Sequence, residues 1–270
     1  MIFMKNIYGY SLIELSICLA LIGIIMGSGL AIGNMGNAKS QSEITEAQLD
    51  EIEYAIQMFV NRYKRPPCPA SLSVAENTVG FGVESLCSGA LPVGVVAINA
   101  GTPEELWVGT VPTRSLGLSD AKMFDAWNGR ISYAVPKSYA VIATPIKNAN
   151  VIDLSKMIKI NDQTNNQIFP QPIPTPSPFN NPVVYVLVSH GVDMRGSYNN
   201  IGVLKRDCNA PLPADTQLDI ENCDHADVVA GNRDAIFRQM DVRTSKIASQ
   251  HFHDFVRFKT RVQFGAAALN

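Results

Sequence analysis

Two short histidine motifs are the parts of this chain whose residue types could do catalytic or metal chemistry. Ser189-His190 places a hydroxyl beside an imidazole, the pairing that a nucleophilic hydrolase uses. Adjacent residues of a strand point to opposite faces, so a turn explains this pair better. His251-Phe252-His253 puts two imidazoles on one face of a strand, but the spacing supplies no further metal ligand. No serine-hydrolase, zinc-protease or phosphate-loop motif is present, and we expect no enzymatic activity.

The five cysteines point to disulfide chemistry. Cys18 lies in an apolar run, and the other four are Cys68, Cys87, Cys208 and Cys223. Their two short separations favour the disulfides Cys68–Cys87 and Cys208–Cys223, although four cysteines allow three pairings. Disulfides persist in oxidising compartments, so this part of the chain is expected to face the periplasm or the exterior. A zinc site is the alternative, but the chain has no C-x-x-C pair.

An acidic segment between Asp207 and Asp234 carries the oxygen ligands that calcium prefers. Its candidate ligands are Asp215, Asp219 and Asp224. The EF-hand spacing is missing, and a solvated acidic loop closed by a disulfide explains the same composition. We therefore expect no cofactor, with calcium as the alternative.

A single carboxylate, Glu14, stands at the edge of a long apolar run. No charged residue lies between Leu15 and Ala38, and a helix of about 20 apolar residues is long enough to cross a bilayer. A secretory signal has a shorter apolar region and a small-x-small cleavage site. The run therefore predicts a retained membrane helix, spanning about 12–33. A charge beside such a helix is costly, roughly 2.5 kcal/mol or more at its centre, and normally marks function.

The segment Gly9-Tyr10-Ser11-Leu12-Ile13-Glu14-Leu15 resembles the amino-terminal signal of type IV pilins and type II secretion pseudopilins. The usual form in that family is G-F-T-L-I-E-L, so tyrosine replaces phenylalanine here. The passage Phe124–Tyr133, which contains Asp125 and Trp127, is similar to the D-x-W-G segment of pseudopilin heads.

This resemblance implies processing and assembly. A prepilin peptidase would cut after Gly9 on the cytoplasmic side and methylate the new amino group of Tyr10. Residues 1–9 would be the leader, and Glu14 would meet the amino terminus of a neighbouring subunit within a bundle of helices. The implied partners are other pilin or pseudopilin subunits, the peptidase, an inner-membrane assembly platform and membrane lipid. The implied location is the inner membrane, crossed once, with a cytoplasmic amino terminus, a periplasmic head and an extracellular fibre after assembly.

The expected fold is α+β, with a long amino-terminal helix packed on a mainly antiparallel β-sheet head. The helix covers residues 10–65, with a membrane half followed by an amphipathic half, and Pro66-Pro67 ends it. The apolar stripe of the amphipathic half consists of Ile44, Ile52, Ala55, Ile56, Phe59, Val60 and Tyr63.

The head covers residues 66–270. Its apolar run Val183–Val188 predicts a buried central strand. Residues 131–135 and 138–144 read as a hairpin around Pro136-Lys137. Residues 161–182 hold six of the sixteen prolines and predict a proline-rich loop.

Composition excludes a general affinity for nucleic acid. The net charge is -2, with 22 Lys and Arg against 24 Asp and Glu. Arg257, Lys259 and Arg261 form a local basic strand face, which more often meets solvent or another subunit than DNA. The sequence thus predicts a structural subunit of a type IV pilus or a type II secretion pseudopilus, in a minor rather than a major role. The alternatives are a fibre-borne adhesin or ligand-binding head, and a membrane-anchored periplasmic enzyme.

Overall fold

The chain divides into two compact units, Met1–Glu43 and Ile44–Asn270. The computed structural model describes residues 12–86, 88–141, 157–169, 182–208, 220–226, 233–240, 252–261 and 263–264. Within the long helix, side chains are described for residues 12–22 and 40–63.

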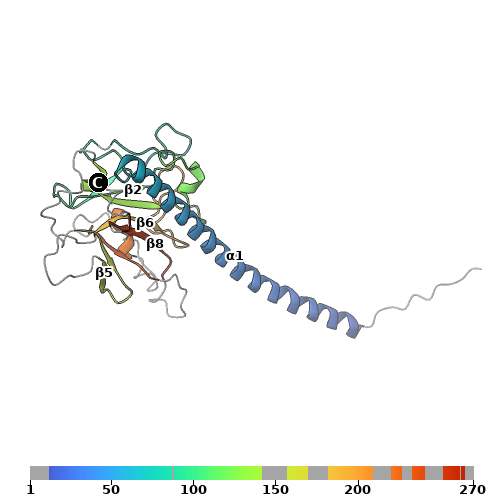
Figure 1. Cartoon of the computed structure of the whole chain (residues 1–270). Helices are drawn as coiled ribbons and strands as arrows, with labels where there is room; N and C mark the ends of the chain where they lie inside the picture. The colour runs from blue at the N-terminus through green and yellow to red at the C-terminus, as the bar shows by residue number, and fades with distance from the viewer. Residues whose placement is uncertain are drawn as a thin grey trace, which may run out of the picture. The chain divides into compact units, whose positions relative to one another are not determined.

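Helix α1 (Leu12–Tyr63) is the first described element (Figure 1). Its last turn closes with a hydrogen bond from the Lys64 amide to the carbonyl of Val60, at 2.8 Å. Lys64 has a φ of 60°, the left-handed conformation in which many helices end, and Pro66 cannot continue the helix.

The predicted membrane half of this helix is wrong. In the part of the chain that the structure describes, no helix is long and apolar enough to cross a membrane. The apolar side chains described at its start, Leu12–Ile22, cover about 16 Å at 1.5 Å per residue, against about 30 Å of hydrocarbon. The predicted fold class, which includes a membrane half, is therefore wrong, and so is the predicted single-pass inner-membrane location with a periplasmic head.

A five-stranded antiparallel sheet forms the centre of the second unit, and the α+β character is therefore as expected. The strand order is β1-β2-β3-β6-β8. The bounds are β1 Val96–Ile98, β2 Leu106–Thr110, β3 Ser132–Pro136, β6 Val183–Ser189 and β8 Phe255–Thr260. Every residue of β6 is buried, and β6 pairs with β3 on one side and β8 on the other, which confirms the predicted central strand.

A second, three-stranded sheet was not expected. Its order is β5-β4-β7, with bounds β4 Lys159–Asn161, β5 Gln167–Phe169 and β7 Ile236–Arg238. Strand β4 pairs parallel to β7, so the two strands require a long crossover connection. The start of the predicted proline-rich loop is therefore a hairpin, and residues 170–181 lie outside the described part.

The two faces of the central sheet bury two different cores. On one face, Ile52, Ile56 and Val60 of α1 pack with Tyr133 and Leu187 of the sheet. On the other face, Ala134 and Val186 pack with Ile160 and Phe237 of the small sheet. Side chains alternate along β3 and β6 between the faces, as the pleat requires. The described head thus has three layers: helix, large sheet and small sheet.

Three short helices complete the described elements: η1 Asp120–Met123, α2 Lys137–Ala140 and η3 Ile220–Ala226. The predicted hairpin around Pro136 is wrong, because β3 leads directly into α2. The Lys137 amide donates instead to the carbonyl of Glu105, at 2.8 Å.

Candidate assembly site

The first described turns of α1 present an apolar surface to solvent. All side chains from Leu12 to Ile22 are exposed, with Leu12 at 88% and Ile13 at 67%. Seven of them are large and apolar: Leu12, Ile13, Leu15, Ile17, Leu19, Leu21 and Ile22. Contiguous exposed apolar surface of this kind marks an interaction site in natural proteins.

Glu14 lies in the first turn of α1, within this apolar surface. The amino end of a helix carries a partial positive charge, so a carboxylate there is favourable before any partner binds. The processing residues Gly9 and Tyr10 lie outside the described residues. Cys18, on the same surface, is a free and exposed thiol.

The disulfide between Cys208 and Cys223 is present, and both cysteines are buried. Cys68 is also disulfide-bonded. Cys87 lies outside the described residues, so the pairing of Cys68 with Cys87 stays a prediction.

The calcium candidates fall mostly outside the described part. Asp215 and Asp219 lie there entirely, and only the backbone of Asp224, in η3, is described. Among the described side chains, no three His, Cys, Asp or Glu residues are placed to share a metal ion.

Asp125 organises a tight turn in the head. Its Oδ1 accepts hydrogen bonds from the amides of Trp127 and Gly129, at 3.0 and 2.8 Å. Its Oδ2 accepts a hydrogen bond from the Ser189 hydroxyl, at 2.7 Å. Burial raises the pKa of this carboxyl, although these donors and Lys205 oppose the shift. The turn presents Trp127 to Phe255, with ring centroids 5.7 Å apart.

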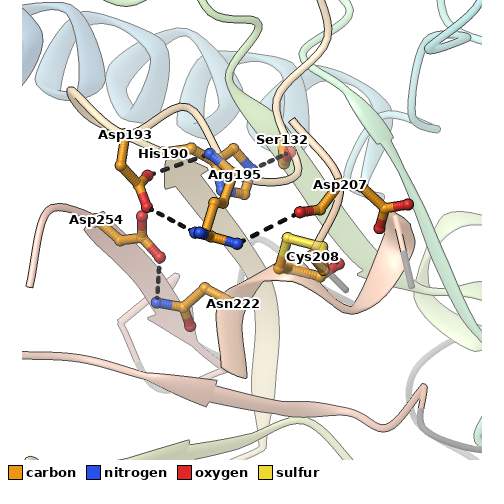
Figure 2. The surroundings of a disulfide bond; sticks show 9 residues. Ser132, His190, Asp193, Arg195, Asp207, Cys208, Asn222 and Asp254 are labelled. Carbon is orange, nitrogen blue, oxygen red and sulfur yellow. Dashed lines mark hydrogen bonds and ion pairs between the residues drawn. A yellow bond between two sulfur atoms is a disulfide. The ribbon is translucent and has the colours of Figure 1, made fainter. Parts of the chain in front are cut away.

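His190 pairs with a different serine from the one beside it in the sequence. The Ser132 hydroxyl and His190 Nε2 lie 2.9 Å apart (Figure 2). The Ser189 hydroxyl donates instead to Asp125. A serine and an imidazole at this distance are able to do nucleophilic chemistry, but both are buried and His190 is 0% exposed. In this structure the pair joins the end of β6 to β3.

Arg195, a buried residue in the loop after β6, contacts the segment that leads to Cys208 (Figure 2). Arg195 Nε lies 3.3 Å from Asp193 Oδ2, and its Nη1 donates to the carbonyl of Asp207, at 3.4 Å. The carbonyl belongs to the residue before Cys208. Ion pair and disulfide thus hold the same stretch of backbone.

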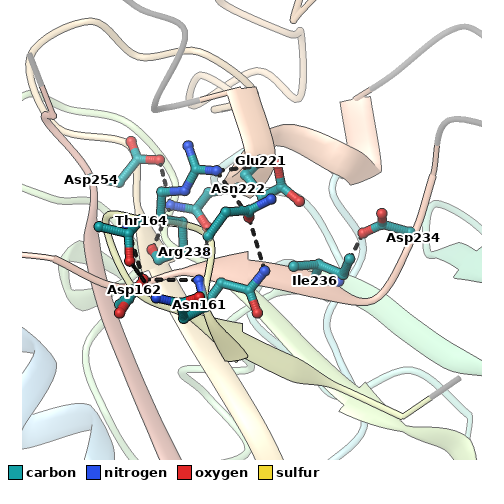
Figure 3. Close-up of polar contacts among 11 residues, drawn as sticks. Asn161, Asp162, Thr164, Glu221, Asn222, Asp234, Ile236, Arg238 and Asp254 are labelled. Carbon is teal, nitrogen blue, oxygen red and sulfur yellow. Dashed lines mark hydrogen bonds and ion pairs between the residues drawn. The ribbon is translucent and has the colours of Figure 1, made fainter. Parts of the chain in front are cut away.

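Asn222 joins η3 to both neighbouring strands (Figure 3). Its side chain accepts from the Arg238 amide at 2.7 Å and donates to the Arg238 carbonyl at 3.0 Å. It also donates to Asp254 Oδ2, at 2.9 Å, just before β8 begins. Burial and the nearby Asp234 raise the pKa of Glu221, which lies 3.9 Å from the Arg238 guanidinium. These contacts fix β7 and β8 in the head.

A surface groove of about 440 Å³ runs beside the start of β8. Most of its lining is polar, whereas pockets for small organic molecules are mainly apolar. The lining residues are Glu46, Asp162, Gln163, Gln239, Met240, Asp254, Phe255, Val256 and Arg257.

No local sequence pattern indicates Arg130, a fully buried cation just before β3. Its guanidinium donates to the carbonyls of Leu72, Val74 and Asn200, at 2.8, 2.7 and 3.0 Å. Burial lowers its pKa to about 10. The partners lie 56 to 70 residues away along the chain, so no local pattern could reveal them.

Comparison of the whole chain with family models, with curated protein sequences and with solved structures gave no match.

Proposed function

We propose that this chain is a structural subunit of the type IV pilin or pseudopilin kind, cut between Gly9 and Tyr10 and assembled through the start of α1. The observation that carries the proposal is the exposed apolar surface at Leu12–Ile22 with Glu14 inside it. That surface directly follows the Gly9-Tyr10 segment that resembles a prepilin cleavage site.

Burial of apolar side chains supplies the driving force in this proposal. Fully burying one leucine or isoleucine side chain contributes about 1.5–3 kcal/mol, and seven large apolar side chains are exposed here. Packing the helices of several subunits side by side removes these side chains from water.

In this proposal Glu14 sets the axial position at which the helix of one subunit packs against that of the next. A carboxylate inside an apolar helix bundle is costly unless a positive charge pairs with it. Cleavage after Gly9 creates such a charge, the amino group of Tyr10, on each subunit. A neighbour then joins favourably only at the axial position where its amine meets Glu14.

The head supports this reading through its polar groups, which are engaged in holding strands and loops together. Asp125, His190 and Arg195 are buried in the described structure, and they contact Ser189, Ser132 and Asp193 of the same head. In this proposal the head packs on the outside of the fibre.

Processing is tested by expressing the chain with an active prepilin peptidase and determining its amino terminus by mass spectrometry. We expect mature chains that begin with N-methylated Tyr10. Gly9→Val should block cleavage, since a β-branched residue crowds the scissile bond. Full-length wild-type chains alone would contradict the proposal.

Assembly is tested with Glu14→Leu, measured in sheared fibre fractions. The variant should be cleaved as the wild type is, because the scissile bond is unchanged, but its incorporation should fall sharply. Glu43→Leu, on the same helix and outside the apolar surface, is the matched control and should be incorporated normally. Incorporation of Glu14→Leu at the wild-type level would refute the role of this carboxylate.

A further inference from the structure

The outward face of α1 in the head unit carries a regular row of five side chains. Glu46, Asp50, Tyr54, Met58 and Arg62 follow one another at four-residue spacing, and all five are exposed. Residues four apart form a ridge on a helix surface. Tyr54 and Met58, at the centre of the row, are 68% and 52% exposed, on the side away from the buried Ile52 and Ile56.

The charges of this row differ from those beside it. Glu51 and Glu53, on the flanks, form ion pairs with Lys122 and Lys259 of the head. In the described part of the chain, Glu46 and Asp50 make no such pair within 4 Å. The Arg62 guanidinium lies over the ring of its own neighbour, Tyr63, at 5.3 Å. The row thus presents two acids, two large apolar groups and one base to solvent.

We propose that this row is a contact surface for a second copy of the chain, packed antiparallel about a two-fold axis at Tyr54. Two-fold symmetry makes each contact reciprocal, so that residue i meets residue j and j meets i. With Tyr54 on the axis, Asp50 meets Met58 of the other copy, and Glu46 meets its Arg62.

Charge selects this arrangement over the parallel ones. Two parallel copies in register place Glu46 against Glu46 and Arg62 against Arg62, which is repulsive. A parallel pair staggered to bring acid to base moves the Tyr54 and Met58 side chains out of contact. The antiparallel pair brings Tyr54 to Tyr54 at the centre and acid to base at both ends, with each Asp50 beside Met58 of the other copy.

This contact goes beyond the proposed function. Fibre assembly through Glu14 requires subunits that lie parallel, whereas the ridge contact is antiparallel and uses neither Glu14 nor the apolar surface around it. It therefore describes a closed pair of heads outside a fibre.

A cysteine at the axis tests the geometry directly. The full chain is kept monodisperse in a non-ionic detergent, with Cys18→Ser to remove the exposed thiol. Tyr54→Cys should then form a disulfide with its own copy under mild oxidation, because residue 54 meets itself. Ala47→Cys, also exposed on α1, is the matched control. In the antiparallel pair, its two copies lie about 21 Å apart along the helix, beyond the reach of a disulfide.

The outcomes are distinct. Crosslinking at 54 and not at 47 supports the proposal. Crosslinking at both positions shows a parallel contact, and crosslinking at neither or at 47 alone shows that the row is not the contact; each overturns the proposal. None of these outcomes depends on Glu14, so they leave the fibre proposal to its own test.

Charge exchange provides a second test, with dimer dissociation measured by sedimentation equilibrium. Arg62→Glu turns two attractive contacts per dimer into repulsive ones and should raise Kd about tenfold. Glu46→Arg combined with Arg62→Glu should restore the wild-type Kd. Lys64→Glu changes the net charge equally at an exposed position outside the row, and should have little effect. An unchanged Kd for Arg62→Glu, or no recovery in the double variant, would overturn the pairing.

Discussion

Replacement of Asp125 by alanine should destabilise the head more than any other single loss of a hydrogen-bond acceptor described above. The carboxylate is 5% exposed and accepts three hydrogen bonds, from the amides of Trp127 and Gly129 and from the Ser189 hydroxyl. In Asp125→Ala all three donors lose their acceptor at a buried site. Each buried unsatisfied donor costs about 1–3 kcal/mol, and donors that share one acceptor do not add fully. We therefore expect a loss of roughly 3–5 kcal/mol, a large part of the 5–15 kcal/mol that stabilises a typical domain.

Asparagine at position 125 keeps the shape of the aspartate side chain but removes its charge, so this variant separates the two contributions. Its amide oxygen is able to accept from both backbone amides, while its NH₂ group donates to Ser189 Oγ with the hydroxyl reversed. Asp125→Asn should therefore cost only about 1 kcal/mol.

Asp162 is the matched control, since its Oδ1 also accepts three hydrogen bonds, from Thr164 N, Thr164 Oγ1 and Asn166 N. Those bonds are exposed, so water replaces the lost acceptor in Asp162→Ala and the effect should be much smaller. The assay is urea denaturation followed by tryptophan fluorescence, with the slope checked for constancy. If Asp125→Ala and Asp162→Ala destabilise equally, burial does not decide the cost and the reasoning fails.

Two further predictions concern the half-buried Glu53 and the disulfide. Burial raises the pKa of Glu53 above its ordinary value of 4.5, although Lys259 opposes the shift. The folded state therefore binds the proton more tightly than the unfolded state, and this contribution to stability is lost as pH rises through the folded pKa. Glu53→Gln has no such loss, so its stability relative to the wild type should increase from below pH 4.5 to neutrality in denaturation curves; a decrease would contradict the assignment. Cys208→Ser opens a link of 15 residues and should cost about 3 kcal/mol, with little more lost on adding Cys223→Ser. Unchanged unfolding of Cys208→Ser under non-reducing conditions would show that the link adds no stability.

The local sequence pattern predicted the structure correctly where one helix face or one run of residues determines it. The continuous apolar run Val183–Val188 predicted a buried central strand, and β6 has that place. The helical stripe was right for Ile52, Ile56 and Val60, which are buried, but wrong for Ile44 and Tyr63, which are exposed. These two lie at the ends of the stripe, and Thr45, next to Ile44, is the residue that faces the head there.

The local sequence pattern predicted the structure wrongly where contacts with distant segments of the chain determine it. Residues 138–144 read as a strand, but α2 forms because β3 already has β2 and β6 as neighbours, and the Lys137 amide is taken by Glu105. The partners of Ser189 and His190 lie 64 and 58 residues away, so the spacing of the pair held no information about its role. The membrane half was inferred from the length of the uncharged apolar run, and the described helix does not support it.

The position of β8 at the edge of the large sheet has a consequence for how the chain is made. Strand β6 is uncharged and wholly buried, and β8, from the carboxyl end of the chain, covers its second edge. At about 5–20 residues per second, synthesis reaches β8 roughly 3–13 s after it completes β6. For that interval an apolar strand has one unpaired edge, the kind of surface on which chains aggregate. A chain that terminates before Phe255 is therefore expected to accumulate as insoluble aggregate rather than as a head of reduced stability.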